Sequence, residues 1–213
     1  MKFIEDQHRD YQKSKLDEQS LTAKPFELFT KWFELAKNAN IVDPNAFILS
    51  TSTTDGKPSS RVVLLKSYDE NGFVFFSNYQ SRKAREIDEN PNVAMLFFWD
   101  DLEKQIRIEG VVEKTSEQES YDYFKTRPYT SKLGSWASRQ SQPLSNRFKL
   151  IREVAKLMAK YPNPNDVPLP PYWGGYRVHP FSFEFWQGRP SRLHDRFLYK
   201  LVDDDWKVQR LYP

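Results

Sequence analysis

The stretch AFILSTSTTDGKPSSRVVLLKS covers residues 46–67 and decides the fold class. Two apolar runs, 46–52 and 60–67, flank a polar turn at 54–57 that contains an Asp-Gly pair. Asp-Gly between two such runs is a strong signal of a β-hairpin, because both residues tolerate the left-handed backbone of a tight turn. The pattern therefore predicts two antiparallel strands in this stretch.

The same pattern of short apolar runs and turns continues along the chain, interrupted by helical segments. Short connections imply antiparallel pairing, because parallel strands need long crossovers. A closed or nearly closed barrel removes the exposed edges of such a sheet. We therefore expect a mainly β protein with inserted helices. The expected strands are 46–52, 60–67, 73–76, 93–99, 105–113, 176–187, 196–202 and 206–211, and the expected helices are 25–38, 82–89, 117–126 and 143–160.

The length of 213 residues favours one domain. Residues 1–20 are polar and charged without a clear apolar face, which is typical of a mobile arm. We therefore expect an arm at 1–20 and a single domain at 21–213.

Composition excludes several classes of function. The chain has no Cys, which rules out disulfides, thiolate nucleophiles and Cys-based zinc sites and fits a reducing, cytoplasmic compartment. Its three His are far apart, so no metal site is expected, and its seven Gly form neither a Rossmann fingerprint nor a P-loop. No apolar run approaches the roughly 20 residues of a membrane span. A net charge of +3 is low for a nucleic-acid-binding protein, although it suits an anionic ligand.

Arg61 and Lys66 bracket the apolar run of the second expected strand. Side chains alternate along a strand, so residues five apart point to opposite faces. The two cations could therefore serve two different sites. The simpler alternative is that both are strand-end residues whose charged heads lie in water.

The stretch Ser81-Arg82-Lys83-Ala84-Arg85 places three cations in the first turn of an expected helix capped by Ser81. The N-terminus of a helix carries partial positive charge, so these cations are unfavourable there. A bound phosphate would remove the conflict, since it accepts from backbone N–H groups and cations together. A solvated surface helix is the equally simple alternative.

Tyr123 and Arg127 lie four residues apart on an expected helix and so share one face. A phenol and a guanidinium together suit a phosphate or a carboxylate. Pro128 is expected to end this helix, so Ser131 need not lie on the same face. An exposed helix end is the alternative.

The stretch Arg192-Leu193-His194-Asp195-Arg196 follows Trp186 and concentrates two Arg and one His. If a strand began at Arg192, then Arg192, His194 and Arg196 would share one face. An imidazole there could exchange protons near neutral pH. The alternative is a charged hairpin loop. Together, the four groups indicate phosphate-bearing ligands and an aromatic-rich pocket without naming a reaction.

From about residue 9 to the C-terminus, the chain resembles the pyridoxine/pyridoxamine 5′-phosphate oxidases, a family of FMN enzymes of vitamin B6 metabolism. Each matching motif is short, but all of them occur in the family's order and near its spacing. The motifs are RVVLLK (61–66), SRKA (81–84), QIRIEG (105–110), YFKTRP (123–128), SWASRQS (135–141), PPYWGGYRV (170–178), FWQGRPSRLHDRF (185–197) and RLYP (210–213).

The resemblance implies an FMN-binding split β-barrel that forms a homodimer, with FMN bound between protomers. Phe76 and Ser77 stand where relatives often have Tyr-Thr, at a contact expected to be largely through the backbone. The residues that match FMN contacts are Arg61, Val62, Val63, Leu64, Leu65, Lys66, Phe76, Ser77, Arg82, Lys83, Gln105, Gln140, Ser141, Trp186 and Arg196.

The resemblance also implies the substrate site. Lys66, Tyr123, Arg127 and Ser131 match residues that hold the substrate phosphate. Arg192, Leu193 and His194 match the surroundings of the pyridine ring, where Arg192 and His194 are the expected catalytic residues. Arg9 and Tyr11 match an arm that closes over the substrate. The implied reaction oxidises pyridoxamine or pyridoxine 5′-phosphate to pyridoxal 5′-phosphate, with O2 as acceptor, and gives H2O2 and, from the amine, NH3.

Two other functions use a similar barrel. One is a flavin oxidoreductase acting on another ring, as in phenazine biosynthesis, against which the retained phosphate-binding set at 66, 123, 127 and 131 argues. The other is a non-catalytic carrier of flavin, haem or pyridoxal phosphate, against which the retained Arg192 and His194 argue.

Overall fold

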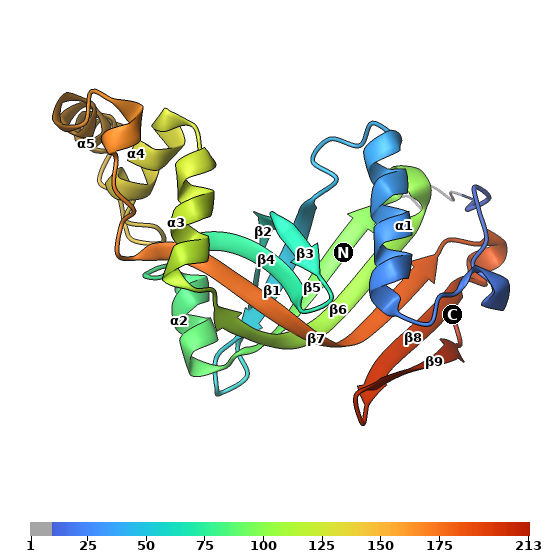
Figure 1. Ribbon diagram of the computed structural model, residues 1–213. Coiled ribbons are helices and arrows are strands. Elements are labelled where there is room, and N and C mark those ends of the chain that lie inside the picture. The colour runs from blue at the N-terminus through green and yellow to red at the C-terminus, as the bar shows by residue number, and fades with distance from the viewer. Residues whose placement is uncertain (1–9) are drawn as a thin grey trace, which may run out of the picture. The chain divides into compact units, whose positions relative to one another are not determined.

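The computed structural model describes residues 10–213, which contain nine strands and five α-helices (Figure 1). The strands are β1 (Ala46–Ser52), β2 (Pro58–Leu64), β3 (Ser67–Asp69), β4 (Gly72–Asn78), β5 (Asn92–Trp99), β6 (Lys104–Lys114), β7 (Trp173–Gln187), β8 (Asp195–Val202) and β9 (Asp205–Leu211). The helices are α1 (Pro25–Asn38), α2 (Arg82–Glu89), α3 (Glu117–Thr126), α4 (Tyr129–Ala137) and α5 (Arg147–Lys160). None of these helices is long and apolar enough to cross a membrane.

The strands form one sheet in the order β2-β1-β5-β6-β7-β4-β3, and β8 pairs with both β7 and β9. The pairings β3–β4, β4–β7, β7–β8 and β8–β9 are antiparallel. The prediction of an antiparallel, mainly β fold with inserted helices is therefore confirmed.

The described residues divide into two compact units, each of which makes most of its contacts within itself. Unit 1 comprises residues 10–48, 94–109 and 180–213, and unit 2 comprises residues 49–93 and 110–179.

Unit 1 is built on an aromatic core between α1 and the sheet. Pro25 occupies the first turn of α1, where its missing N–H costs no hydrogen bond. The buried face of the helix then places Phe29 against Phe97 of β5, with ring centroids 5.3 Å apart, and Trp32 against Phe185 of β7, also at 5.3 Å. Edge-to-face packing of this kind adds to the burial of the rings themselves.

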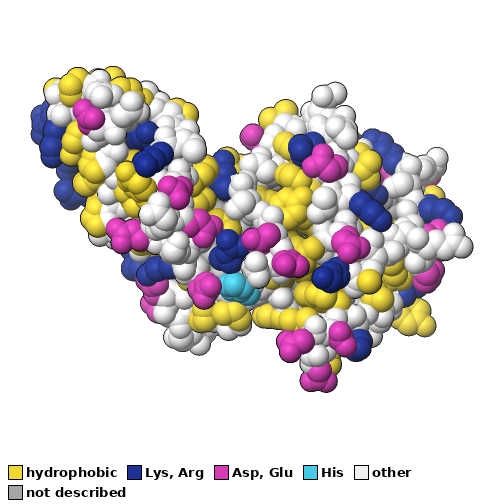
Figure 2. Space-filling view, in the orientation of Figure 1, with side chains coloured by type: hydrophobic (Ala, Val, Ile, Leu, Met, Phe, Trp, Pro, Cys, Tyr) yellow, Lys and Arg dark blue, Asp and Glu magenta, His cyan; other side chains and the backbone are white. Residues whose placement is uncertain are grey.

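Unit 2 combines strands β2–β4 with helices α2–α5. A small core of Phe124, Leu133, Val167 and Trp173 joins α3, α4 and the start of β7. The densest group of Lys and Arg on the face shown in Figure 2 lies over α5, whereas acidic and basic side chains are mixed elsewhere in that view.

Two predictions about unit 2 were wrong. The expected strand 60–67 is interrupted, because β2 ends at Leu64 and β3 begins at Ser67. Helix α4 was missed. Pro128 ends α3 by forcing Arg127 into an extended conformation, as expected, but it also stands at the N-cap of α4, so a new helix starts at the next residue.

Leu28 and Leu35 lie on the same helix, α1, with 2% and 49% of their surface exposed. We expect Leu28→Ala to lower the free energy of unfolding by about 2–5 kcal/mol, because it leaves a cavity in a packed core. Leu35→Ala, the matched control, should change it by less than about 1 kcal/mol. Urea unfolding followed by circular dichroism measures both. Equal losses would contradict the assignment of the buried face.

Candidate active site

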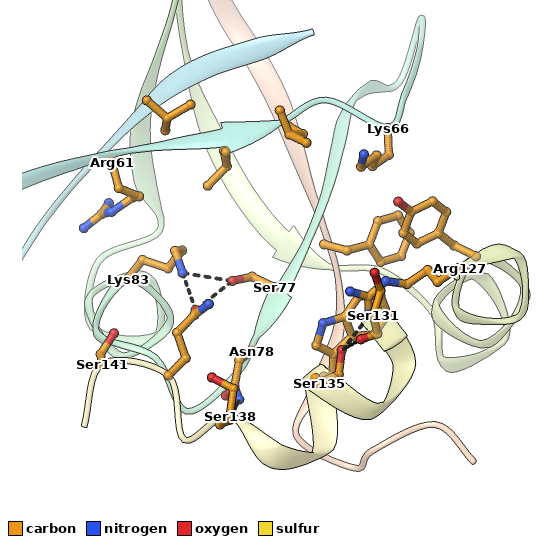
Figure 3. A pocket seen from close by; sticks show the side chains of 18 of the residues that line it. Arg61, Lys66, Ser77, Asn78, Lys83, Arg127, Ser131, Ser135, Ser138 and Ser141 are labelled. Atoms are coloured by element: carbon orange, nitrogen blue, oxygen red, sulfur yellow. Dashed lines mark hydrogen bonds between the residues drawn. The ribbon is translucent and has the colours of Figure 1, made fainter. Parts of the chain in front are cut away.

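A cavity of about 990 Å³ lies within unit 2 (Figure 3). Strands β2 and β4, helices α2, α3 and α4, and the segment 138–141 all contribute to its wall. The structure thus brings together most of the predicted site residues that belong to this unit. Those that line the cavity are Arg61, Val62, Val63, Leu64, Lys66, Phe76, Ser77, Arg82, Lys83, Tyr123, Arg127, Ser131, Gln140 and Ser141. The side chain of Leu65 is instead buried and does not line it.

The charge of the cavity wall is one-sided. Among the described residues, five cationic side chains line it and no carboxylate does; the cations are Arg61, Lys66, Arg82, Lys83 and Arg127. They fall into two groups, with Arg61 and Lys83 on one side of the cavity and Lys66 and Arg127 on the other (Figure 3). Lys83 is buried and Arg61 and Arg127 are partly buried, whereas Lys66 and Arg82 are exposed. Burying a cation without a negative partner is costly, so this wall favours anions.

Lys83 is the most buried cation of the first group, with 8% of its surface exposed. Its Nζ donates to Ser77 Oγ at 2.9 Å and to Gln140 Oε1 at 2.6 Å, both of which are neutral. Burial, aided by the charge of Arg61, lowers the pKa of Lys83 to about 8. No carboxylate within residues 10–213 pairs with this lysine, so a bound anion would stabilise its charged form.

The start of α2 adds backbone groups to this end of the cavity. Ser81 caps the helix, as predicted, and accepts from the N–H of Ala84. The Oγ of Ser141 accepts from the N–H of Arg82 at 3.1 Å, which ties the segment 138–141 to the helix N-terminus. Both predicted residues of that segment, Gln140 and Ser141, therefore meet α2.

Arg127 is the central cation of the second group. Its guanidinium lies over the ring of Trp173, 4.5 Å from the centroid, and donates to Ser135 Oγ. Burial lowers the pKa of Arg127 despite the nearby Tyr123. Helix spacing alone left the position of Ser131 open, and helix α4 brings it to the same cavity as Arg127.

An aromatic stack forms the wall between α3 and β7. Phe76 and Tyr123 stack with centroids 4.0 Å apart, and Trp173 stacks on Phe76 at 5.4 Å. Trp173 and Ser135, which support Arg127, were not among the predicted site residues, although both lie inside motifs that carried the resemblance. Their contacts with Arg127 join α3 to β7 and to the unpredicted helix α4, so the sequence pattern alone could not show them.

The remaining predicted residues belong to unit 1. Tyr11, Trp186 and His194 form a ring cluster there, in which the Trp186 and His194 centroids are 4.6 Å apart. Tyr11 meets Trp186 at 5.7 Å and His194 at 5.5 Å, both edge-on. Gly188 makes room for Tyr11, since a Cβ there would come within 2.5 Å of the Tyr11 ring. Tyr11 and His194, both predicted to belong to the substrate site, thus lie together in unit 1.

The surroundings of His194 favour its neutral imidazole form. Its Nδ1 accepts from the backbone N–H of Arg189 at 3.1 Å, so the neutral ring carries its proton on Nε2. Burial and the charges of Arg192 and Arg196 lower the pKa of His194. At neutral pH the ring therefore offers an N–H donor rather than a positive charge.

Two other predicted residues of unit 1 are partly buried. Arg196 pairs with the buried Glu184, with Nε and Oε1 2.8 Å apart, and Gln105 lies half-buried on β6.

Arg192 and Leu193, in contrast, are exposed in the turn before β8. Because β8 begins at Asp195, the shared face considered for 192, 194 and 196 does not form. Arg192 adopts φ 61°, a left-handed conformation found at few non-glycine residues. Arg9 lies outside the described residues.

Comparison with known proteins identifies the family to which the chain belongs. The family model described as pyridoxamine 5′-phosphate oxidase matches residues 35–159. A second model, described as the pyridoxine 5′-phosphate oxidase C-terminal dimerisation region, matches residues 173–213. The chain belongs to the pyridoxamine 5′-phosphate oxidase family. The resemblance drawn from the sequence is therefore confirmed.

Curated relatives of the family cover nearly the whole chain. The pyridoxine/pyridoxamine 5′-phosphate oxidase of Rubrobacter xylanophilus is 51% identical over 96% of this chain and 94% of its own length. The enzyme of the same name from Actinobacillus pleuropneumoniae is 52% identical over 96% of each chain.

Solved structures give the fold of the family. PhzG from Burkholderia lata, solved in complex with tetrahydrophenazine-1-carboxylic acid, is 34% identical. It covers 93% of this chain and 98% of its own, with a TM-score of 0.87. An FMN-binding protein related to the family, from Nostoc punctiforme, has a TM-score of 0.71 at 14% identity and shows a similar fold. The predicted split-barrel fold is confirmed.

The lowered pKa of Lys83 gives a test on the ligand-free protein. The unfolded chain binds more protons than the folded chain between pH 8 and about 10.4, so Lys83 makes the wild type more stable as pH rises through that window. Lys83→Met lacks this dependence. We expect the stability of the variant relative to wild type to fall by about 1–2 kcal/mol between pH 7.5 and 9.5.

Urea unfolding in phosphate-free buffer at the two pH values measures the difference. Lys57→Met, at an exposed position in the same unit, gives the background slope. A difference between Lys83→Met and wild type that does not change with pH would show that Lys83 is not buried as described.

Proposed function

We propose that this protein is an FMN-dependent oxidase that converts pyridoxamine 5′-phosphate and pyridoxine 5′-phosphate to pyridoxal 5′-phosphate, with O2 as acceptor. The observation that carries the proposal is a cavity lined by five cations in two groups and by no carboxylate within the described residues. Two groups suit two phosphates. The first would bind the cofactor phosphate and the second the substrate phosphate.

The first group fits FMN. Lys83 is a buried cation whose hydrogen-bond partners within the described residues, among them Ser77 and Gln140, are neutral. Ser141 adds a further polar group to this end of the cavity. A phosphate there would complete the hydrogen bonding of these donors. Residues 61–64 and 66 would lie along the flavin, and Arg61, Arg82 and Lys83 would hold its phosphate. When bound, FMN supplies the two-electron acceptor that O2 reoxidises, with release of H2O2.

The second group fits the substrate phosphate. Arg127 presents a planar fork that lies over the Trp173 ring, and such a fork can bind two phosphate oxygens. Lys66, Tyr123 and Ser131 would supply the remaining donors. Because both groups line one cavity, the substrate ring would lie beside the flavin, and such positioning is most of what a protein contributes to this chemistry.

The residues proposed to surround the substrate ring are Tyr11, Arg192 and His194. His194, neutral with its proton on Nε2, would donate a hydrogen bond to a ring substituent. Arg192 would press on the ring and Tyr11 would cover it. In the overall reaction the substrate carbon loses a hydride and its amine or hydroxyl a proton. With the amine, water then converts the imine to the aldehyde and NH3.

The active form is proposed to be a homodimer with FMN at its interface. The match of residues 173–213 to a model described as a dimerisation region supports this assembly. Gln105, Trp186 and Arg196 also match FMN contacts of the family and are proposed to belong to the cofactor site of this dimer. The cytoplasmic location and the single domain at 21–213 stay predictions.

A phenazine-type oxidoreductase is the second candidate, favoured by the 34% identity to PhzG. The curated phosphate oxidases are about 50% identical, over similar lengths. Arg127, with Lys66 and Tyr123 in the same cavity, also suits a phosphorylated substrate.

The deciding experiment is anaerobic reduction of the FMN-loaded protein. We expect pyridoxamine 5′-phosphate to bleach the flavin absorbance, and admission of O2 to restore it with formation of H2O2 and pyridoxal 5′-phosphate. Protein that binds no FMN, or that is bleached by a dihydrophenazine but not by the B6 phosphates, would overturn the proposal.

Arg127→Ala tests the substrate phosphate site. We expect unchanged flavin content and a KM for pyridoxamine 5′-phosphate raised at least tenfold, since a charge-assisted hydrogen bond contributes about 1.5–3 kcal/mol. Turnover of unphosphorylated pyridoxamine should change little. Arg152→Ala, at an exposed position on α5, is the control. Equal losses with both substrates would place Arg127 in the general architecture of the protein.

A further inference from the structure

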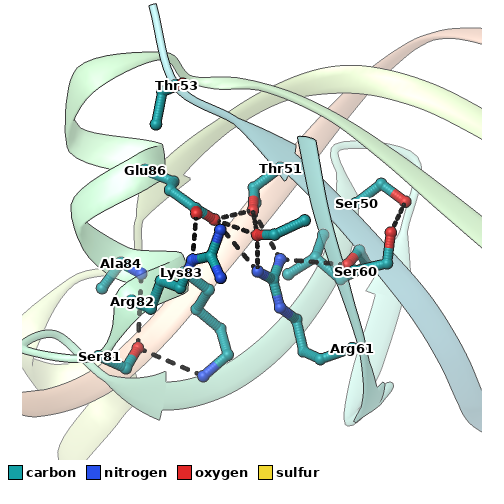
Figure 4. A network of polar contacts seen from close by, with 12 residues as sticks. Ser50, Thr51, Thr53, Ser60, Arg61, Ser81, Arg82, Lys83, Ala84 and Glu86 are labelled. Carbon is teal, nitrogen blue, oxygen red and sulfur yellow. Dashed lines mark hydrogen bonds and ion pairs between the residues drawn. The ribbon is translucent and has the colours of Figure 1, made fainter. Parts of the chain in front are cut away.

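Glu86 is a buried carboxylate beside the first cationic group and was not among the predicted site residues. Its side chain is 5% exposed and accepts from four donors (Figure 4). The hydroxyls of Thr51 and Ser59 donate to Oε2 at 2.5 Å each. Arg61 donates to the same oxygen at 3.1 Å, and Arg82 Nε donates to Oε1 at 2.7 Å.

Glu86 thus joins two arginines that come from different elements. Arg61 stands on β2 and Arg82 on α2, and each guanidinium is fixed by one of its nitrogens on the carboxylate. Arg61 is held further by Thr51 Oγ1 at 2.6 Å and by the Leu49 carbonyl at 3.2 Å. Within residues 10–213, the terminal nitrogens of Arg82 meet no acceptor. They remain available to a ligand.

The net charge at this end of the cavity also favours a bound phosphate. Three cations, Arg61, Arg82 and Lys83, face one carboxylate, Glu86, and leave two positive charges. A phosphate monoester carries about −1.5 to −2 at neutral pH, which would neutralise them. Burial disfavours the charge of Glu86, but the hydrogen bonds from Ser59, Thr51, Arg82 and Arg61 outweigh it and lower the pKa of the carboxyl to about 2.

We propose that Glu86 is a positioning residue for the cofactor phosphate, holding Arg61 and Arg82 in the orientation that binds it. This inference rests on the proposed function, since it assumes that FMN is the ligand of this end of the cavity. Glu86 itself would not touch the phosphate, because two negative groups repel; it acts through the two arginines.

Positioning and simple electrostatics predict opposite results for Glu86→Gln. Removing a negative charge near a phosphate should tighten FMN binding if only net charge matters. Releasing Arg61 and Arg82 should weaken it if their orientation matters, because flexible side chains must then be ordered on binding. The sign of the change therefore separates the two roles.

The experiment titrates full-length apoprotein with FMN and with riboflavin, which has the same ring and no phosphate, and follows flavin fluorescence. We expect Glu86→Gln to weaken FMN binding at least tenfold and to leave riboflavin binding within twofold of wild type. Asp88→Asn is the control, because it removes the same charge from α2 at an exposed residue whose ion pair is with Lys114 and not with a cavity cation. It should bind both flavins as wild type does.

Unchanged or tighter FMN binding by Glu86→Gln would overturn the inference, and equal weakening of FMN and riboflavin would reduce Glu86 to a structural role. Glu86→Asp keeps the charge, and so the fold, but withdraws the carboxylate by one methylene. It should also weaken FMN binding selectively, and wild-type affinity in this variant would contradict positioning. Failure of the wild type to bind FMN would instead overturn the proposed function.

Discussion

Buried positive charge that the chain does not neutralise is the constraint on which the site depends. A cation removed from water must find a partner, and the cost of leaving it unpaired is several kcal/mol. In unit 2, five cations line the cavity; Lys83 is buried, Arg61 and Arg127 are partly buried, and Lys66 and Arg82 are exposed. Among the described residues, Arg61 and Arg82 pair with Glu86, whereas Lys83 and Arg127 pair with no carboxylate. A bound anion would therefore stabilise the charge of Lys83 and Arg127.

Unit 1 contains a buried lysine that is held without an anion. Lys104 has a pKa lowered to about 8 by burial, as Lys83 has, but its Nζ lies 4.2 Å from the centre of the Trp32 ring. A ring face attracts a cation in place of an anion. Lys83 has no such internal partner among the described residues and faces a cavity, which distinguishes a binding residue from a structural one.

Local signals in the sequence were enough for most of the fold, because turns and caps depend on neighbouring residues. The Asp-Gly turn, the Ser81 cap and Pro25 each defined an element correctly. Sequence could not reveal Glu86 or Trp173 as parts of the site, since their roles depend on contacts between distant elements. Glu86 is one of several acidic residues on α2, and only the fold shows that it is the one turned inward against β2.

The interruption after Leu64 has a consequence for the site. In a continuous strand, Arg61 and Lys66 would point to opposite faces, and only one of them could reach a given cavity. The strand instead ends at Leu64, and the chain turns while the N–H of Lys66 donates to the Val74 carbonyl at 2.9 Å. Leu65 enters the core, and both cations line one cavity. Two cations that strand alternation would separate are thereby brought to two sides of one pocket. This is the arrangement that the proposed function requires, since a phosphorylated cofactor and a phosphorylated substrate must each find a cation while their rings meet.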